Sequence, residues 1–164
     1  MKLMELTENI QAKLLDNVKR HEGGEHYQQK TGSFKNNRFY TYKDSLGLHT
    51  IGYGHLVRPS ESFPDGMTVD AANQLLKRDL DVAVSDANSW IVLSGKPAEV
   101  QIILIEMVYQ LGKGRACGFK KFAEAIERKD YLAAAQELVA STWHTQTPNR
   151  VEEYASVLKS LHRG

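Results

Sequence analysis

The segment 97–111 constrains the fold more than any other, because apolar side chains fall on nearly every side of the helix that it predicts. Proline is favoured in the first turn of a helix, and Pro97 holds that position, while Gly112 and Gly114 end the segment. A helix that is apolar all round is stable in water only when other elements bury it. The sequence therefore predicts a central helix enclosed by the rest of the chain.

Length and composition limit what can surround that helix. A chain of 164 residues with 41% hydrophobic residues buries roughly 69% of its unfolded surface, enough for a core without metals or disulfides. The single cysteine, Cys117, excludes an intrachain disulfide and a cysteine-based metal site. A net charge of +1 gives no strong attraction to nucleic acid. No apolar run reaches the ~18 residues that cross a bilayer, and no histidine pair has zinc-like spacing. We expect no membrane insertion, no metal and no cofactor.

The residue composition and the spacing of apolar residues change twice along the chain, and these changes predict an α+β fold. Residues 5–21 have helical apolar spacing, 23–38 are typical of a polar loop, and 39–54 are rich in strand formers around a Ser45-Leu46-Gly47 turn. The remainder is helical in pattern, with helices expected over 67–88, 97–111, 119–128, 130–140 and 149–161. We expect one domain over 1–164, with a cleft between its lobes. Its parts are an N-terminal helix (1–22), a β-containing small lobe (23–66), a connecting helix (67–88) and a helical lobe (89–164).

Three polar residues fall near the ends of the first elements. Glu22 lies at the end of the first helix, Asp44 at the end of the first strand, and Thr50 on the second strand. With a turn at 45–47, Asp44 faces Leu48 and lies about 7–8 Å by Cα from Thr50, so that both can hold one water. Two carboxylates in different environments, one protonated and one ionised, carry out glycoside hydrolysis. Judged by residue type alone, Asp44 is more often a turn residue than a base, and Glu22 is more often a solvated residue than an acid.

Several motifs follow one another over roughly residues 21–151. They are His21-Glu22-Gly23, Tyr42-Lys43-Asp44-Ser45-Leu46-Gly47, Thr50-Ile51-Gly52-Tyr53-Gly54-His55-Leu56, Met107-Val108-Tyr109-Gln110-Leu111-Gly112 and Gln146-Thr147-Pro148-Asn149-Arg150. Together they resemble the phage lysozymes of the T-even type, glycoside hydrolase family 24. The resemblance implies a lysozyme-like fold and an N-acetylmuramidase whose partners are peptidoglycan glycan strands.

The resemblance also implies a role for each matching residue. Glu22 would be the general acid, while Asp44 and Thr50 would hold the attacking water, so that the β-1,4 bond between N-acetylmuramic acid and N-acetylglucosamine is cleaved with inversion. Four further residues match substrate-binding or supporting positions of the family: Leu56, Tyr109, Gln110 and Arg150. His55 and Asp79 match a structural pair.

Two of the departures from the family pattern bear directly on the general acid and on Arg150. Glu22 and Asp44 are farther apart than usual, and the extra residues fall in 24–38, which we expect to form a loop insertion at the cleft edge. That insertion makes Glu25 a substitute candidate for the acid. Glu106 stands where the T-even enzyme has an asparagine near the arginine, so a third carboxylate there competes with Glu22 for Arg150.

Two other functions fit the same motifs. A lytic transglycosylase needs one acid/base and no hydrolytic water, so Asp44 would be dispensable. A wall-binding virion module would have kept the fold and lost the activity. Because the N-terminus lacks the apolar core of a signal peptide, we expect a monomer in the host cytoplasm that reaches the wall through holin-type pores, or a virion-associated protein.

Overall fold

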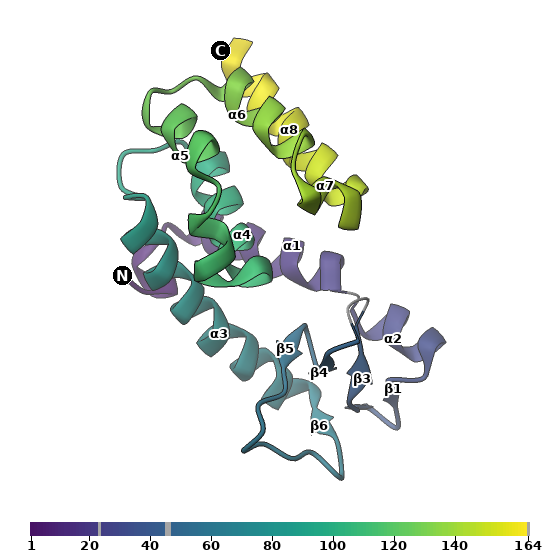
Figure 1. Ribbon diagram of the computed structural model, residues 1–164. Coiled ribbons are helices and arrows are strands. Elements are labelled where there is room, and N and C mark those ends of the chain that lie inside the picture. Colours follow the sequence, from purple (N-terminus) through teal and green to yellow (C-terminus); the bar gives the residue numbers. More distant parts are fainter. Residues whose placement is uncertain (23, 45–46, 164) are drawn as a thin grey trace. The chain divides into compact units, whose positions relative to one another are not determined.

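The computed structural model describes the backbone of residues 1–22, 24–44 and 47–163, and their side chains except those of 22, 25, 26 and 163. The chain divides into two compact units, Lys2–Val82 and the part from Ala83 onward, with which Met1 is grouped. Among the described residues, strands occur only in the first unit, and the second unit is built from helices (Figure 1). The expected α+β fold class is therefore confirmed.

The first unit begins with a short 3-10 helix, η1 (Leu3–Glu5), and the helix α1 (Glu8–Glu22). Thr7 caps α1, because its Oγ1 accepts a hydrogen bond from the Ile10 N–H at 3.3 Å. Leu14 and Val18 are fully buried on the apolar face of this helix. The helix expected over 5–21 is confirmed, and it begins three residues late because residues 3–5 form the 3-10 turn.

The polar segment 23–38 is not the loop that the sequence predicts. It contains α2 (Glu25–Thr31) and the strand β1 (Phe34–Lys35). Asn36 and Asn37 have φ values of 53° and 60°, the left-handed conformation that a two-residue hairpin turn requires. The turn leads into β2 (Arg38–Phe39), which pairs with β1.

The side chain of Gln28 fixes α2 to the rest of the first unit. Its Nε2 donates to the Gly52 carbonyl at 2.7 Å, and its Oε1 accepts from the Ser33 hydroxyl at 2.9 Å. Gln28 is only 1% exposed. The insertion is thus packed against the turn at Gly52, and it does not simply bulge into solvent.

Two small antiparallel sheets complete the first unit. One has the order β1-β2-β6, with β6 at Met67–Thr68, and the other has the order β3-β4-β5. The strands of the second sheet are β3 (Tyr42–Lys43), β4 (His49–Ile51) and β5 (His55–Leu56). Gly47 has a φ of 79°, as the predicted turn requires, whereas Ser45 and Leu46 lie outside the described residues.

Helix α3 (Val69–Trp90) runs from the first unit into the second and matches the connecting helix expected over 67–88. Its N-terminus is capped by Thr68, whose Oγ1 accepts from the Ala71 N–H at 3.1 Å. Leu76 and Leu80 are buried on its apolar face within the first unit. The start of the chain is tied to this helix, because the Leu3 N–H donates to Asp81 Oδ1 at 2.8 Å.

The predicted central helix is α4 (Ala98–Cys117), and its apolar residues from Val100 to Val108 are at most 7% exposed. The helical segment breaks at Gly112, where φ is 81° and ψ is 155°, and a further turn continues to Cys117. The sequence therefore located the break correctly, although it did not predict the continuation. None of the helices in the described part of the chain is both long and apolar enough to cross a bilayer.

Four helices follow α4 in the second unit: α5 (Lys120–Glu127), α6 (Tyr131–Val139), α7 (Thr142–Gln146) and α8 (Pro148–Arg163). Helices α6 and α8 lie side by side, with α7 joining them (Figure 1). Trp143 of α7 is 3% exposed and packs its ring 5.6 Å from that of Tyr154 on α8. Trp143 is therefore a core residue.

Candidate active site

Asp44 and Thr50 converge on the backbone of Leu48 in the first unit. Asp44 Oδ1 accepts from the Leu48 N–H at 2.9 Å, and the Thr50 hydroxyl donates to the Leu48 carbonyl at 3.1 Å. The backbone N–H of Asp44 donates to the same carbonyl at 2.9 Å, which closes the hairpin. The predicted register, with Asp44 opposite Leu48, is therefore confirmed by the pairing of Tyr42 with Thr50 and of Lys43 with His49.

The bond that Thr50 donates fixes the role that its hydroxyl can have toward a ligand. A hydroxyl has one hydrogen and two lone pairs, and Thr50 gives its hydrogen to the Leu48 carbonyl. Its oxygen is left to act as an acceptor, as a carboxylate always does. A water that donates to both Asp44 and Thr50 keeps its own lone pair for attack on a carbon atom.

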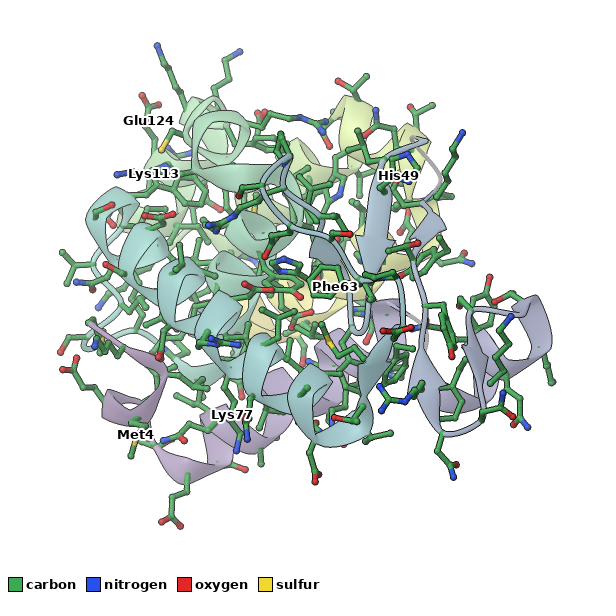
Figure 2. All side chains as sticks on the ribbon, turned by 90° about the horizontal axis from the view of Figure 1, so that it is seen from below. Met4, His49, Phe63, Lys77, Lys113 and Glu124 are labelled. Atoms are coloured by element: carbon green, nitrogen blue, oxygen red, sulfur yellow. The ribbon has the colours of Figure 1, made fainter. Side chains whose placement is uncertain are left out.

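The strand pattern sets the direction of the neighbouring side chains. Thr50 is 4% exposed, whereas His49, one residue earlier, is exposed at the surface (Figure 2). Leu56 pairs with Thr50 across β4 and β5, so that both side chains lie on one face of the sheet. The side chain of Leu56 is 53% exposed, which suits a residue that contacts a ligand.

Glu22 is the last residue of α1, and its side chain lies outside the described part of the structure, as does that of Glu25. The separation of the Glu22 and Asp44 carboxyls therefore stays a prediction. The last turns of α1 do lie beside the turn after β4, because Lys19 Nζ is 4.9 Å from the centre of the Tyr53 ring. Tyr53 also packs edge-on against Phe39 at 4.9 Å.

His55 is held between two carboxylates. Its Nδ1 is 2.8 Å from Asp79 Oδ2 on α3, and its Nε2 is 2.9 Å from Glu61 Oε1. The hydrogen bond with Asp79 raises the pKa of His55 above its ordinary value of 6.5, and Glu61 acts in the same direction against the opposing effect of burial. The pairing of His55 with Asp79 matches the prediction. Glu61 was missed, because no periodic pattern marks a loop carboxylate six residues away.

The remaining candidates lie in the second unit. An Nη1 hydrogen of Arg150 on α8 is donated to Gln110 Oε1 on α4, so the two predicted residues are brought together. Gln110 Nε2 is buried and has no hydrogen-bond partner among the described residues. A buried donor of this kind is costly unless a ligand satisfies it. Tyr109, beside Gln110, is half-buried.

Glu106 is fully buried one helical turn before Gln110. Its Oε1 accepts a hydrogen bond from the hydroxyl of Tyr154 at 2.8 Å. Glu106 is recognisable in the sequence as a departure from the family pattern, whereas nothing marks Tyr154 as its partner, because the two residues are distant in the chain. Among the described residues, no group of three or more histidine, cysteine or acidic side chains is placed to hold a metal ion.

The first unit holds a carboxylate and a hydroxyl on one hairpin, and its strand β5 is linked to α3 through His55 and Asp79, an arrangement that suits a hydrolase. Comparison with known proteins gives the family. The family model for phage lysozyme matches residues 32–160, which include Asp44, Thr50, Leu56, Tyr109, Gln110 and Arg150 but not Glu22. The chain belongs to the phage lysozyme family, whose members are peptidoglycan-lytic glycoside hydrolases.

Individual relatives agree with this assignment. "Probable T4-type lysozyme 1" of Dictyostelium discoideum is 31% identical over 144 residues, covering 73% of this chain and 85% of the relative. "Endolysin" of Salmonella phage P22 is 34% identical over 101 residues, covering 60% of this chain and 68% of the relative. "Peptidoglycan hydrolase gp36" of Pseudomonas phage phiKMV is 30% identical over 131 residues, covering 78% of this chain and 14% of that much longer relative.

Proposed function

We propose that this chain is an inverting N-acetylmuramidase that cleaves the β-1,4 bond between N-acetylmuramic acid and N-acetylglucosamine. The observation that carries the proposal is the pair of bonds from Asp44 and Thr50 to Leu48. They hold a carboxylate and a hydroxyl oxygen on one hairpin, and in this proposal both accept hydrogen bonds from the same water. An inverting glycosidase needs such a water on the face of the sugar opposite its general acid.

The reaction proceeds in one displacement. Glu22 gives its proton to the glycosidic oxygen, and the bond between that oxygen and the anomeric carbon of N-acetylmuramic acid breaks. The water held by Asp44 and Thr50 attacks the anomeric carbon from the other face, and Asp44 takes its proton. Proton exchange with solvent then restores a protonated Glu22 and an ionised Asp44.

The other predicted residues bind the glycan. Leu56, on the same sheet face as Thr50, offers an apolar contact to a sugar ring. In the second unit, Gln110 supplies a donor that has no partner among the described residues, and its neighbour Arg150 supplies a positive charge. Peptidoglycan carries carbonyl and carboxylate oxygens that accept from both groups.

Clearing of permeabilised Gram-negative cells by the purified protein tests the proposal. We expect clearing by the unchanged protein and a loss of at least about 100-fold for Glu22→Gln and for Asp44→Asn, the usual size of a lost acid or base. Retained clearing by Asp44→Asn would instead indicate a lytic transglycosylase. No clearing by any form, with binding to cell walls preserved, would indicate an inactive wall-binding module.

We also propose that the protein is a monomer that acts on the wall from the host cytoplasm through holin-type pores, or from the virion. Relatives named "Endolysin" and "Peptidoglycan hydrolase gp36" come from phages, which supports this setting. Expression in a bacterial host with and without a co-expressed holin distinguishes the two routes. Lysis that depends on the holin supports the cytoplasmic route, and lysis without it contradicts that route.

A further inference from the structure

We propose that Glu106 and Tyr154 form an internal anchor that positions Arg150 for the reaction. The anchor goes beyond the proposed function, and it rests on that function only for the role of Arg150 at the substrate. Glu106 is a positioning residue in this account, because it is fully buried and acts through the arginine.

The geometry of two helices carries the proposal. Glu106 and Gln110 lie one turn apart on α4, and Arg150 and Tyr154 lie one turn apart on α8, so each pair occupies one face of its helix. Glu106 bonds to Tyr154, and Gln110 bonds to Arg150. The two helices are therefore joined by two adjacent polar contacts in antiparallel order.

The contact between Glu106 and Tyr154 is buried, so the loss of hydration of the carboxylate must be compensated. A carboxylate excluded from water is stable only when charge and hydrogen bonds compensate its lost hydration. The Tyr154 hydroxyl supplies one such bond at 2.8 Å, and its ring is held by Trp143. Burial and the negative charge of Glu106 raise the pKa of Tyr154 far above its ordinary range, so the tyrosine remains a proton donor at every working pH.

Arg150 carries a positive charge one helical turn before Tyr154 on α8. Because Tyr154 bonds Glu106 and Arg150 bonds Gln110 at successive turns of the same two helices, we infer that the guanidinium lies close to the Glu106 carboxylate. At short range in a poorly solvated site, opposite charges interact more strongly than they do in water. In this proposal Glu106 acts as the internal counter-charge of Arg150, while Gln110 bonds its guanidinium directly.

The consequence is an arginine that is oriented before substrate arrives. A long, flexible side chain loses conformational freedom when it is fixed in a site, and this cost lowers the rate if it falls in the transition state. With the anchor in place, the arginine side chain loses this conformational freedom when the protein folds, before substrate binds. Removal of the negative charge should therefore lower kcat more than it changes KM.

A double-mutant cycle tests this coupling with Glu106→Gln and Arg150→Gln. Glutamine keeps an oxygen that accepts from Tyr154 and removes the charge. We expect Glu106→Gln to lower kcat about tenfold, within the range for coupled neighbours, and to have less than a twofold effect once Arg150 is replaced. Glu99→Gln, an exposed charge change on the same helix, is the control and should leave kcat unchanged. An equal, tenfold loss in both backgrounds would overturn the proposal.

Urea unfolding of the same four proteins tests the anchor without relying on activity. We expect the two substitutions together to lower the urea midpoint by clearly less than the sum of their separate effects. A fifth protein, Tyr154→Phe, removes the donor of a buried carboxylate and should lower the midpoint more than Glu106→Gln does. If the unchanged protein failed to cleave peptidoglycan, the proposed function would fall while this coupling remained. Additive shifts of the midpoint would overturn the anchor whatever the activity.

Discussion

Gln28 and Gly52 are joined by a 2.7 Å hydrogen bond from a side-chain amide to a backbone carbonyl. Because this amide is 1% exposed, its removal leaves the Gly52 carbonyl without its donor in a site that water reaches poorly. We predict that Gln28→Ala lowers the free energy of unfolding by about 2 kcal/mol, the cost of an unsatisfied buried polar group. Chemical denaturation measures this loss.

The matched control for this prediction is Gln29→Ala, because Gln29 is the next residue of α2 and is exposed. It should change the free energy of unfolding by less than about 0.5 kcal/mol, as surface substitutions usually do. Equal effects of the two substitutions would show that α2 is not held by the amide of Gln28.

The pH dependence of stability should report the pairing of His55 with Asp79 and Glu61. The pKa of His55 is raised on folding by its bond with Asp79. Its contribution is therefore fully present below about pH 6.5 and is lost as the pH rises through the folded pKa. We predict that the free energy of unfolding falls above pH 6.5, and that His55→Gln removes this slope. His49→Gln, which changes an exposed histidine, should leave the slope intact.

Glu61 contributes with the opposite sign. Its pKa is lowered from an ordinary value of 4.5 by the bond that it accepts from the Arg58 N–H, and further by His55. This contribution is present above about pH 4.5 and is lost as the pH falls through the folded pKa. Glu61→Gln should therefore flatten the acid side of the stability curve, and it should also weaken the fall above pH 6.5. An unchanged curve on both sides would contradict the carboxylate pair.

The hydroxyl oxygen of Thr50 is predicted to accept a hydrogen bond from the attacking water. Thr50→Val keeps the shape of the side chain and removes the hydroxyl, and we expect kcat to fall by about 10-fold to 100-fold as one contact to the water is lost. Thr50→Ser keeps the oxygen and should retain most of the activity. Steady-state assays on purified cell walls separate these outcomes, and similar rates for Ser and Val would contradict the role of the hydroxyl.

Much of this architecture follows from local patterns in the sequence. The apolar run around Ile102–Val108 requires a buried helix, and Gly47 allows the left-handed turn that brings Asp44 opposite Leu48. The pair Asn36-Asn37 is also a local signal of a hairpin, although a loop was predicted there. Asparagine tolerates positive φ, and the flanking Phe34 and Phe39 form the paired strands.

Other features have no local signature. Helix α2 has only seven residues, and a polar side chain, the amide of Gln28, holds it in place. Its sequence therefore lacks the apolar periodicity that would predict a helix. The bond between Glu106 and Tyr154 joins residues that are 48 positions apart, and neither residue predicts the other. Sequence patterns indicate which face of a helix is buried, but they do not indicate which polar groups meet there.

The anomeric form of the first product tests the central claim, that a water held by Asp44 and Thr50 displaces the glycan. Proton NMR at early times shows which anomer of N-acetylmuramic acid is released from purified peptidoglycan. Inversion of the β-linkage predicts that the α-anomer appears first. The β-anomer would indicate a covalent intermediate, and an anhydro-sugar without a reducing end would indicate that no water takes part. Either product would contradict the account.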